Sequence, residues 1–86
     1  GQPAIHIGED HHYLALFEAE EPGQVRPEYG RVGFNHLGLV VDDLDAYRAR
    51  LKERGVTVQL EADYEPGRRL YFYDPDGIEV ELVQYD

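Results

Sequence analysis

The most informative part of the chain is residues 71–82, which read Tyr-Phe-Tyr-Asp-Pro-Asp-Gly-Ile-Glu-Val-Glu-Leu. Residues 74–77 (Asp-Pro-Asp-Gly) predict a tight turn, because proline presets φ and glycine accepts a positive φ. Aromatic and β-branched residues flank the turn, so we expect one strand over residues 69–73 and another over residues 78–83.

Upstream of this pair of strands, a strand and a helix are expected. Residues 32–41 are apolar on both faces, which is typical of a strand that is covered on both sides. Asp42 is expected to start the helix, with Asp42 and Asp43 supplying an N-cap and negative charge for its first turn. Asp45 lies three residues after Asp42, in the spacing of a capping box.

The helix is followed by a further strand. One apolar stripe runs along the helix, made of Leu44, Tyr47 and Leu51. Gly55 is the expected helix stop, residues 56–60 alternate as a strand, and residues 61–67 are expected to form a loop. The order from residue 32 is therefore β-α-β-β-β, an α+β fold.

The first third of the chain is organised differently. Residues 1–18 predict a hairpin, and residues 19–31, with two prolines and two glycines, predict a linker or long loop. Residues 32–86 then hold one complete β-α-β-β-β module. Because the hairpin has no helix of its own, we interpret it as the tail of an incomplete first module. A polypeptide that is a fragment of a longer protein would have this organisation.

Size and cysteine content limit how the fold is stabilised. A chain of 86 residues is one domain at most and buries a small core. Disulfides and cysteine-based zinc sites are excluded, because the sequence has no cysteine. The remaining contributors are a metal held by histidine and carboxylate groups, or a partner chain.

Charge excludes several classes of partner. The formal net charge is −10, so we expect no binding to nucleic acid or to anionic membranes. An ordinary acidic protein and one adapted to high salt both fit this charge. The sequence has no apolar run long enough to span a membrane and no basic, apolar N-terminal leader, so a cytoplasmic location is expected.

His36 and Glu81 are the candidate functional residues that the strands provide. His36 lies in an apolar strand, and Glu81 lies between Val80 and Leu82. A hydrogen-bonded core histidine and a solvent-facing glutamate would explain each residue taken alone. Alternation places Glu79 and Glu81 on one face of the last strand, which therefore faces either solvent or a polar cavity.

From His36 onward, the chain resembles the vicinal oxygen chelate superfamily, which holds glyoxalases, bleomycin resistance proteins and extradiol dioxygenases. The matching segments are residues 36–45, 50–51, 55–56 and 71–82. The most specific element is the Asp-Pro-Asp-Gly turn followed, four residues after its glycine, by Glu81. The resemblance implies a β-α-β-β-β module whose sheet curves around a cavity for a metal or a ligand.

The resemblance also implies a metal site and catalytic groups. His36 and Glu81 match the family's metal ligands, for a divalent ion such as Fe, Mn, Zn or Ni. His12 matches a histidine that works as acid–base in extradiol enzymes, and Tyr71 matches a tyrosine that hydrogen-bonds the substrate hydroxyl. The expected function is therefore a divalent-metal-dependent enzyme, dioxygenase-like or lyase, acting on a small substrate that chelates through two oxygens.

Two departures from the family pattern leave an alternative open. Ala15 lies where the first module would supply a ligand from its last strand, so a third ligand must come from residues outside this chain or from another molecule. Residues 61–69 lack the histidine that extradiol enzymes carry, and Arg68 or Arg69 is a candidate anion-binding replacement. The alternative is a metal-free drug-binding protein of the bleomycin resistance type. Either protein is expected to complete its sheet as a homodimer.

Overall fold

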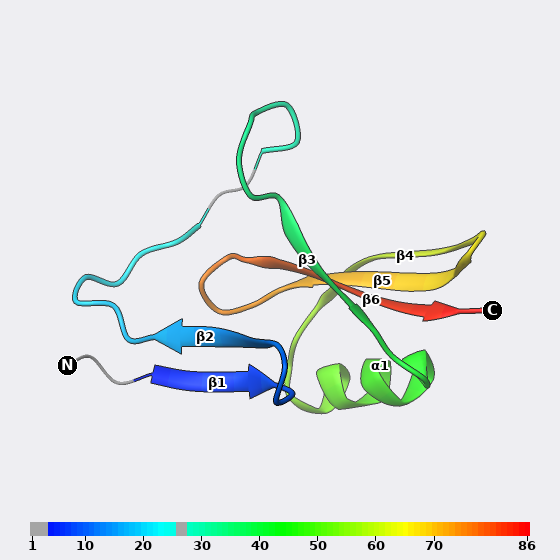
Figure 1. The fold of residues 1–86 in the computed structure, drawn as a ribbon. Helices are drawn as coiled ribbons and strands as arrows, with labels where there is room; N and C mark the ends of the chain where they lie inside the picture. Colours follow the sequence, from blue (N-terminus) through cyan, green and yellow to red (C-terminus); the bar gives the residue numbers. More distant parts are fainter. Residues whose placement is uncertain (1–3, 26–27) are drawn as a thin grey trace.

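The computed structural model describes residues 4–25 and 28–86, and its order of elements confirms the β-α-β-β-β module (Figure 1). The elements are β1 (Ala4–Gly8), β2 (Tyr13–Phe17), β3 (His36–Val40), α1 (Leu44–Glu53), β4 (Val58–Tyr64), β5 (Gly67–Tyr73) and β6 (Glu79–Tyr85). Strands β1 and β2 form a separate two-stranded antiparallel sheet. The other strands form one sheet in the order β3-β6-β5-β4, in which only β3 and β6 are parallel.

Helix α1 covers one face of the four-stranded sheet, below it in Figure 1. The buried core between them consists of Leu44, Leu70, Val80 and Leu82. Period-two alternation directs Leu70 of β5 and Val80 and Leu82 of β6 toward the helix. The same alternation directs Glu79 and Glu81 of β6 to the opposite face, so the core fixes which side chains are left for a site.

The helix begins later than the sequence analysis expected. It starts at Leu44, and its N-cap is Asp43, whose Oδ1 accepts a hydrogen bond from the backbone N–H of Ala46 at 3.1 Å. The prediction that Asp42 starts the helix and pairs with Asp45 in a capping box was therefore wrong. Asp45 instead pairs with Arg48, three residues further along the helix, and with Arg68 of β5.

Two predicted strand boundaries were also wrong. The strand expected over residues 32–41 covers only residues 36–40, because Gly33 takes a positive φ of 149° and Val32 is fully exposed. The loop expected at residues 61–67 is mostly strand, and it pairs Asp63 with Arg68 across β4 and β5. The charged residues of β4 were misread as a loop, although charge is typical of an edge strand.

The turn between β5 and β6 is confirmed and also anchors the linker. Asp74 Oδ1 accepts the backbone N–H groups of Asp76 and Ile78, each at 2.9 Å. The backbone N–H of Val25 donates to the carbonyl of Asp76 at 2.7 Å, so the linker packs against the turn. Gly77, at a φ of +89°, lies so close to the linker that an added Cβ would be 2.4 Å from the Val25 carbonyl oxygen.

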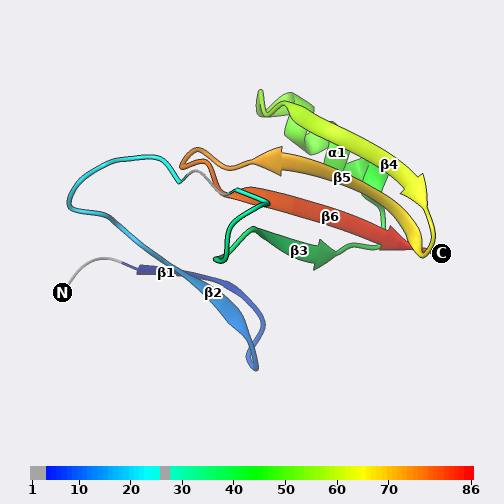
Figure 2. The same ribbon diagram turned by 90° about the horizontal axis from the view of Figure 1, so that it is seen from above.

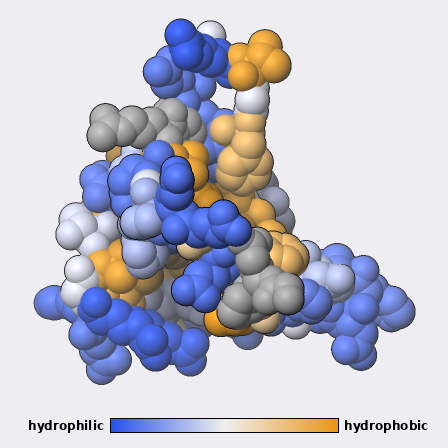
Figure 3. All heavy atoms as spheres, turned by 90° about the vertical axis from the view of Figure 1, so that its left-hand side faces the viewer, coloured by the Kyte–Doolittle hydropathy of each residue, from blue (hydrophilic) through white to orange (hydrophobic). Residues whose placement is uncertain are grey.

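The hairpin lies apart from the four-stranded sheet, beyond β3 (Figure 2). Every residue of β1 and β2 except Leu14 is exposed, including Ile5 and Phe17. Figure 3 shows apolar side chains among hydrophilic ones on the side of the molecule that faces left in Figure 1. Within the part of the chain that the structure describes, no helix is long and apolar enough to cross a membrane.

Candidate functional site

The open face of the four-stranded sheet carries the candidate site residues, because register and alternation bring them to one side. Glu79 and Glu81 of β6 pair in register with Tyr73 and Tyr71 of β5. On the other side of β6, the partner of Glu79 is His36 of β3. Residues paired across strands share a face, so this polar and aromatic group lies on the side away from α1.

His36 and Glu81, both predicted as metal ligands, are in direct contact. Nε2 of His36 lies 3.0 Å from Oε1 of Glu81. The other ring nitrogen, Nδ1, lies 2.6 Å from Oδ1 of Asn35, and this second contact fixes the orientation of the ring. The Glu81 side chain is 12 % exposed and that of His36 is 29 % exposed, so both lie at the floor of the face and remain accessible.

Arg69 is the second partner of Glu81. Its Nη1 donates to Oε2 of Glu81 at 3.1 Å, so each carboxylate oxygen of Glu81 has its own nitrogen partner. The guanidinium carbon of Arg69 lies 4.4 Å from the centre of the Tyr64 ring, a cation–π contact. Arg68 or Arg69 was expected as an anion-binding group. Arg68 pairs with Asp45 and Arg69 with Glu81. Within the described residues, the buried Nε and Nη2 of Arg69 have no hydrogen-bond partner.

Tyr71 lies against His36, with ring centres 5.8 Å apart in an edge-to-face arrangement. Burial, and then the negative charge of Glu81, raise the pKa of the Tyr71 phenol above its usual value. Tyr71 is therefore a neutral hydrogen-bonding group over the pH range in which most enzymes work. This property suits the substrate-orienting role that the sequence analysis expected for it.

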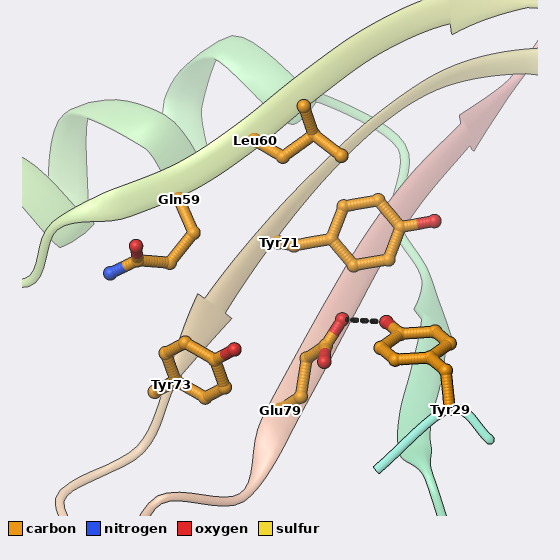
Figure 4. Close-up of a pocket in the computed structure, with 6 residues that line it drawn as sticks. All are labelled: Tyr29, Gln59, Leu60, Tyr71, Tyr73 and Glu79. Carbon is orange, nitrogen blue, oxygen red and sulfur yellow. Dashed lines mark hydrogen bonds between the residues drawn. The ribbon is translucent and has the colours of Figure 1, made fainter. Parts of the chain in front are cut away.

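Next to His36 and Glu81, the open face is hollowed into a cavity of about 410 Å³ (Figure 4). It is lined by Tyr29, Gln59, Leu60, Tyr71, Tyr73 and Glu79. The hydroxyl of Tyr29 donates to Oε1 of Glu79 at 2.5 Å, and Figure 4 shows the two side chains pointing toward one another. This hydrogen bond to a carboxylate raises the pKa of Tyr29 to about 12.

The donor set at His36 and Glu81 fits a divalent metal ion in part. Two ligands about 2.1 Å from a metal and at right angles to each other lie ~3 Å apart, which is the separation of Nε2 and Oε1. Among residues 4–25 and 28–86, no group of three or more His, Cys, Asp or Glu residues is placed to hold a metal. Two ligands from this chain leave room for ligands from elsewhere.

Comparison with known proteins assigns the family. The protein-family model of the Glyoxalase/Bleomycin resistance protein/Dioxygenase superfamily matches residues 2–82 of this sequence. The chain belongs to this superfamily. This assignment confirms the resemblance that was read from residues 36–45 and 71–82.

Three similar proteins illustrate the relationship. The chain is 38 % identical over 71 residues to the uncharacterized protein YaeR of Escherichia coli, covering 79 % of this chain and about half (51 %) of that protein. A glyoxylase/bleomycin resistance protein/dioxygenase domain from Frankia superposes with a TM-score of 0.73 at 25 % identity, covering 94 % of this chain and 63 % of the other. The fosfomycin resistance protein FosX of Listeria monocytogenes has the same fold, with a TM-score of 0.71 at 22 % identity over 99 % and 65 % of the two chains.

His12, the proposed acid–base residue, is not brought to the open face. It follows the β1–β2 turn, which lies apart from the four-stranded sheet (Figure 2), and its Nε2 is 3.6 Å from Oε2 of Glu9. Both side chains are largely exposed. The structure thus groups three of the four predicted superfamily site residues, namely His36, Tyr71 and Glu81, and leaves His12 outside the group.

Several functional candidates on the open face were not identified from the sequence. Glu79 was placed on the face of Glu81 but was not proposed for a role, although it is only 6 % exposed. Tyr29 lies 50 residues before Glu79, in a segment interpreted as a linker, and no local pattern indicates their contact. Arg69 lies two residues before Tyr71 in β5, and this spacing indicates that the two side chains share a face.

Proposed function

We propose that this chain contributes His36 and Glu81 to a divalent-metal site in an enzyme that acts on a small molecule. The substrate would chelate the metal through two oxygens, as the sequence analysis expected. The observation that carries the proposal is the 3.0 Å contact between Nε2 of His36 and Oε1 of Glu81 in a face that borders a cavity. Imidazole and carboxylate are a donor pair suited to Fe, Mn, Zn or Ni.

A bound metal would supply Lewis-acid activation of the chelated oxygens. The remaining work falls to the chain itself. Tyr71 is neutral and next to His36, so its hydroxyl can hold a substrate oxygen by a hydrogen bond. Asn35 fixes the ring of His36 through Nδ1, which leaves Nε2 directed toward Glu81. The proton-transfer role of His12 would require the hairpin to meet the open face of another module.

We further propose that residues 1–18 are the tail of an incomplete first module and that residues 32–86 are a complete one. The chain spans about half the length of YaeR, and its hairpin exposes large apolar side chains such as Ile5 and Phe17. Both observations favour a second module, supplied by the same polypeptide or by a second copy in a homodimer. That module would carry the missing metal ligands. A cytoplasmic location remains the matching expectation for such an enzyme.

The test is metal binding by the protein and by Glu81→Ala, measured by native mass spectrometry and by calorimetric titration with Zn(II), Mn(II), Ni(II) and Fe(II). We expect one metal per completed site in the parent protein and a loss of affinity of more than ~100-fold in Glu81→Ala, since even outer-shell changes cost ~10–100-fold. Glu53→Ala, on the exposed surface of α1, removes the same charge as a control. Full metal occupancy in Glu81→Ala would refute the proposal, and a parent protein without metal would favour the metal-free binding protein.

A further inference from the structure

The cavity beside the proposed metal site is built around a buried carboxylate, that of Glu79. Glu79 is 6 % exposed and lies at the start of β6, where Val80 packs into the core on the other face. A carboxylate taken out of water is costly unless it meets hydrogen-bond donors or a positive charge. The surroundings of Glu79 therefore indicate what kind of group would stabilise it.

No cation of the described residues 4–25 and 28–86 pairs with this carboxylate. Glu81, two residues away on the same face, has His36 and Arg69 within 3.1 Å. Glu79 instead accepts a hydrogen bond from the phenol of Tyr29, which carries no charge. The positive charge near Glu81 thus has no counterpart near Glu79.

Three tyrosine rings surround the carboxylate. Tyr73 pairs in register with Glu79, Tyr71 is the next cavity residue along β5, and Tyr29 approaches from the loop before β3 (Figure 4). Their rings and the side chain of Leu60 give the cavity an apolar wall, with the carboxylate of Glu79 at one point on it. Aromatic faces attract cations, and they do so most strongly where water is displaced.

We propose that the cavity formed by Tyr29, Tyr71, Tyr73 and Glu79 is a subsite for an alkylammonium group of the ligand. The carboxylate of Glu79 supplies the opposite charge, and the tyrosine rings supply cation–π contacts to the alkyl groups on nitrogen. A volume of about 410 Å³ accommodates such a group with part of the molecule that carries it. This subsite is separate from the metal ligands, so it does not depend on the proposed metal.

The test compares choline with 3,3-dimethylbutan-1-ol, which has the same shape but carries carbon in place of the charged nitrogen. Binding is measured by calorimetry and by the NMR shift of the methyl protons, with EDTA present so that metal binding plays no part. We expect choline to bind the parent protein at least ~10-fold more tightly than the neutral alcohol, with upfield shifts from the tyrosine rings. Glu79→Gln should abolish this preference.

Glu53→Gln is the matched control, because it changes the net charge equally on the exposed surface of α1 and should keep the preference. Tyr73→Leu provides a second variant in case Glu79→Gln fails to fold. It leaves the carboxylate in place and should reduce the choline preference and the ring-current shift. The proposal is overturned if the parent protein does not prefer choline, or if folded Glu79→Gln or folded Tyr73→Leu keeps the full preference.

Discussion

Two carboxylates on one strand face, only two residues apart, have opposite surroundings. Glu81 lies between an imidazole and a guanidinium, and each of its oxygens has a nitrogen partner. Glu79 lies among phenols, and Tyr29 is its hydrogen-bonding partner. The comparison teaches that the position of a residue along a strand determines its chemistry as much as its side chain does. One open face thus carries both proposed sites, the metal site at Glu81 and the alkylammonium subsite at Glu79.

The difference comes from what each neighbouring strand places next to the carboxylate. Near Glu81, β5 supplies Arg69, which pairs in register with Val83, two residues beyond Glu81 in β6. Near Glu79, β5 supplies Tyr73, and the loop before β3 supplies Tyr29. Among the described residues 4–25 and 28–86, basic partners lie beside Glu81 and not beside Glu79, so substitutions can address each half separately.

The largest expected effect is a loss of folding stability, which would disrupt the Glu81 half and the Glu79 half of the face together. Leu82 is 5 % exposed and packs between the sheet and α1, on the opposite side of β6 from both carboxylates. Leu82→Ala should lower the free energy of unfolding by about 2–5 kcal/mol, because it leaves a cavity in a small core. Urea unfolding followed by circular dichroism measures this change. Val32→Ala, at a fully exposed position, should change stability by less than ~0.5 kcal/mol, and a large effect there would contradict the packing described.

A smaller effect should separate the two halves. Gly38 of β3 pairs with Glu81, and an added Cβ would lie 3.5 Å from Oε1 of Glu81. Gly38→Ala should be tolerated, because 3.5 Å is an ordinary contact. The extra methyl groups of Gly38→Val should crowd the carboxylate and weaken metal binding by roughly 10-fold, similar to other changes around a ligand.

The measurement is the affinity for Zn(II) and for choline in the same two variants. Choline binding should be unchanged in both, because Gly38 is paired with Glu81 and not with Glu79. If Gly38→Val weakened both ligands equally, the two halves of the face would not be independent. Gly38→Ala controls for the loss of glycine itself.

The smallest expected effect is a change in the pKa of one tyrosine hydroxyl, that of Tyr29. The hydrogen bond to Glu79 raises the pKa of Tyr29 to about 12, so the folded state keeps this proton over a pH range in which an ordinary tyrosine has lost it. The stability from this contact is fully present below pH ~10 and is lost as the pH rises through about 12. Glu79→Gln should return the pKa toward ~10, whereas Glu81→Gln should leave it raised. NMR titration of tyrosine labelled at Cζ reads the change, and an unshifted Tyr29 in the parent protein would argue against the contact.

The sequence was most informative where short-range rules act. The turn at residues 74–77 and the helix stripe of Leu44, Tyr47 and Leu51 predicted the element order correctly, because each depends on nearby residues. The contact of His36 with Glu81 was reached through the family resemblance, because strand order cannot be read from spacing. Alternation then explained why both side chains share a face.

The parts that could not be predicted depend on long-range packing. Tyr29 belongs to a segment rich in turn residues, and nothing local indicates that its hydroxyl reaches Glu79. The polar residues between Leu60 and Gly67 resemble a loop in isolation, and only pairing with β5 makes them strand. Asp43 and Asp42 are chemically equivalent candidates for the N-cap, and backbone geometry decides between them.

The close approach at Gly77 lies between the linker and the start of β6, where Glu79 lines the cavity. A single added carbon atom there would clash with the carbonyl oxygen of Val25. It would also disfavour the φ of +89° that Gly77 adopts and that glycine accepts freely. Glu79 begins its strand two residues later, and Tyr29, its hydrogen-bond partner, lies four residues after Val25 in the sequence. We therefore expect a methyl group at this turn to disturb the Tyr29–Glu79 contact, which joins residues 50 positions apart.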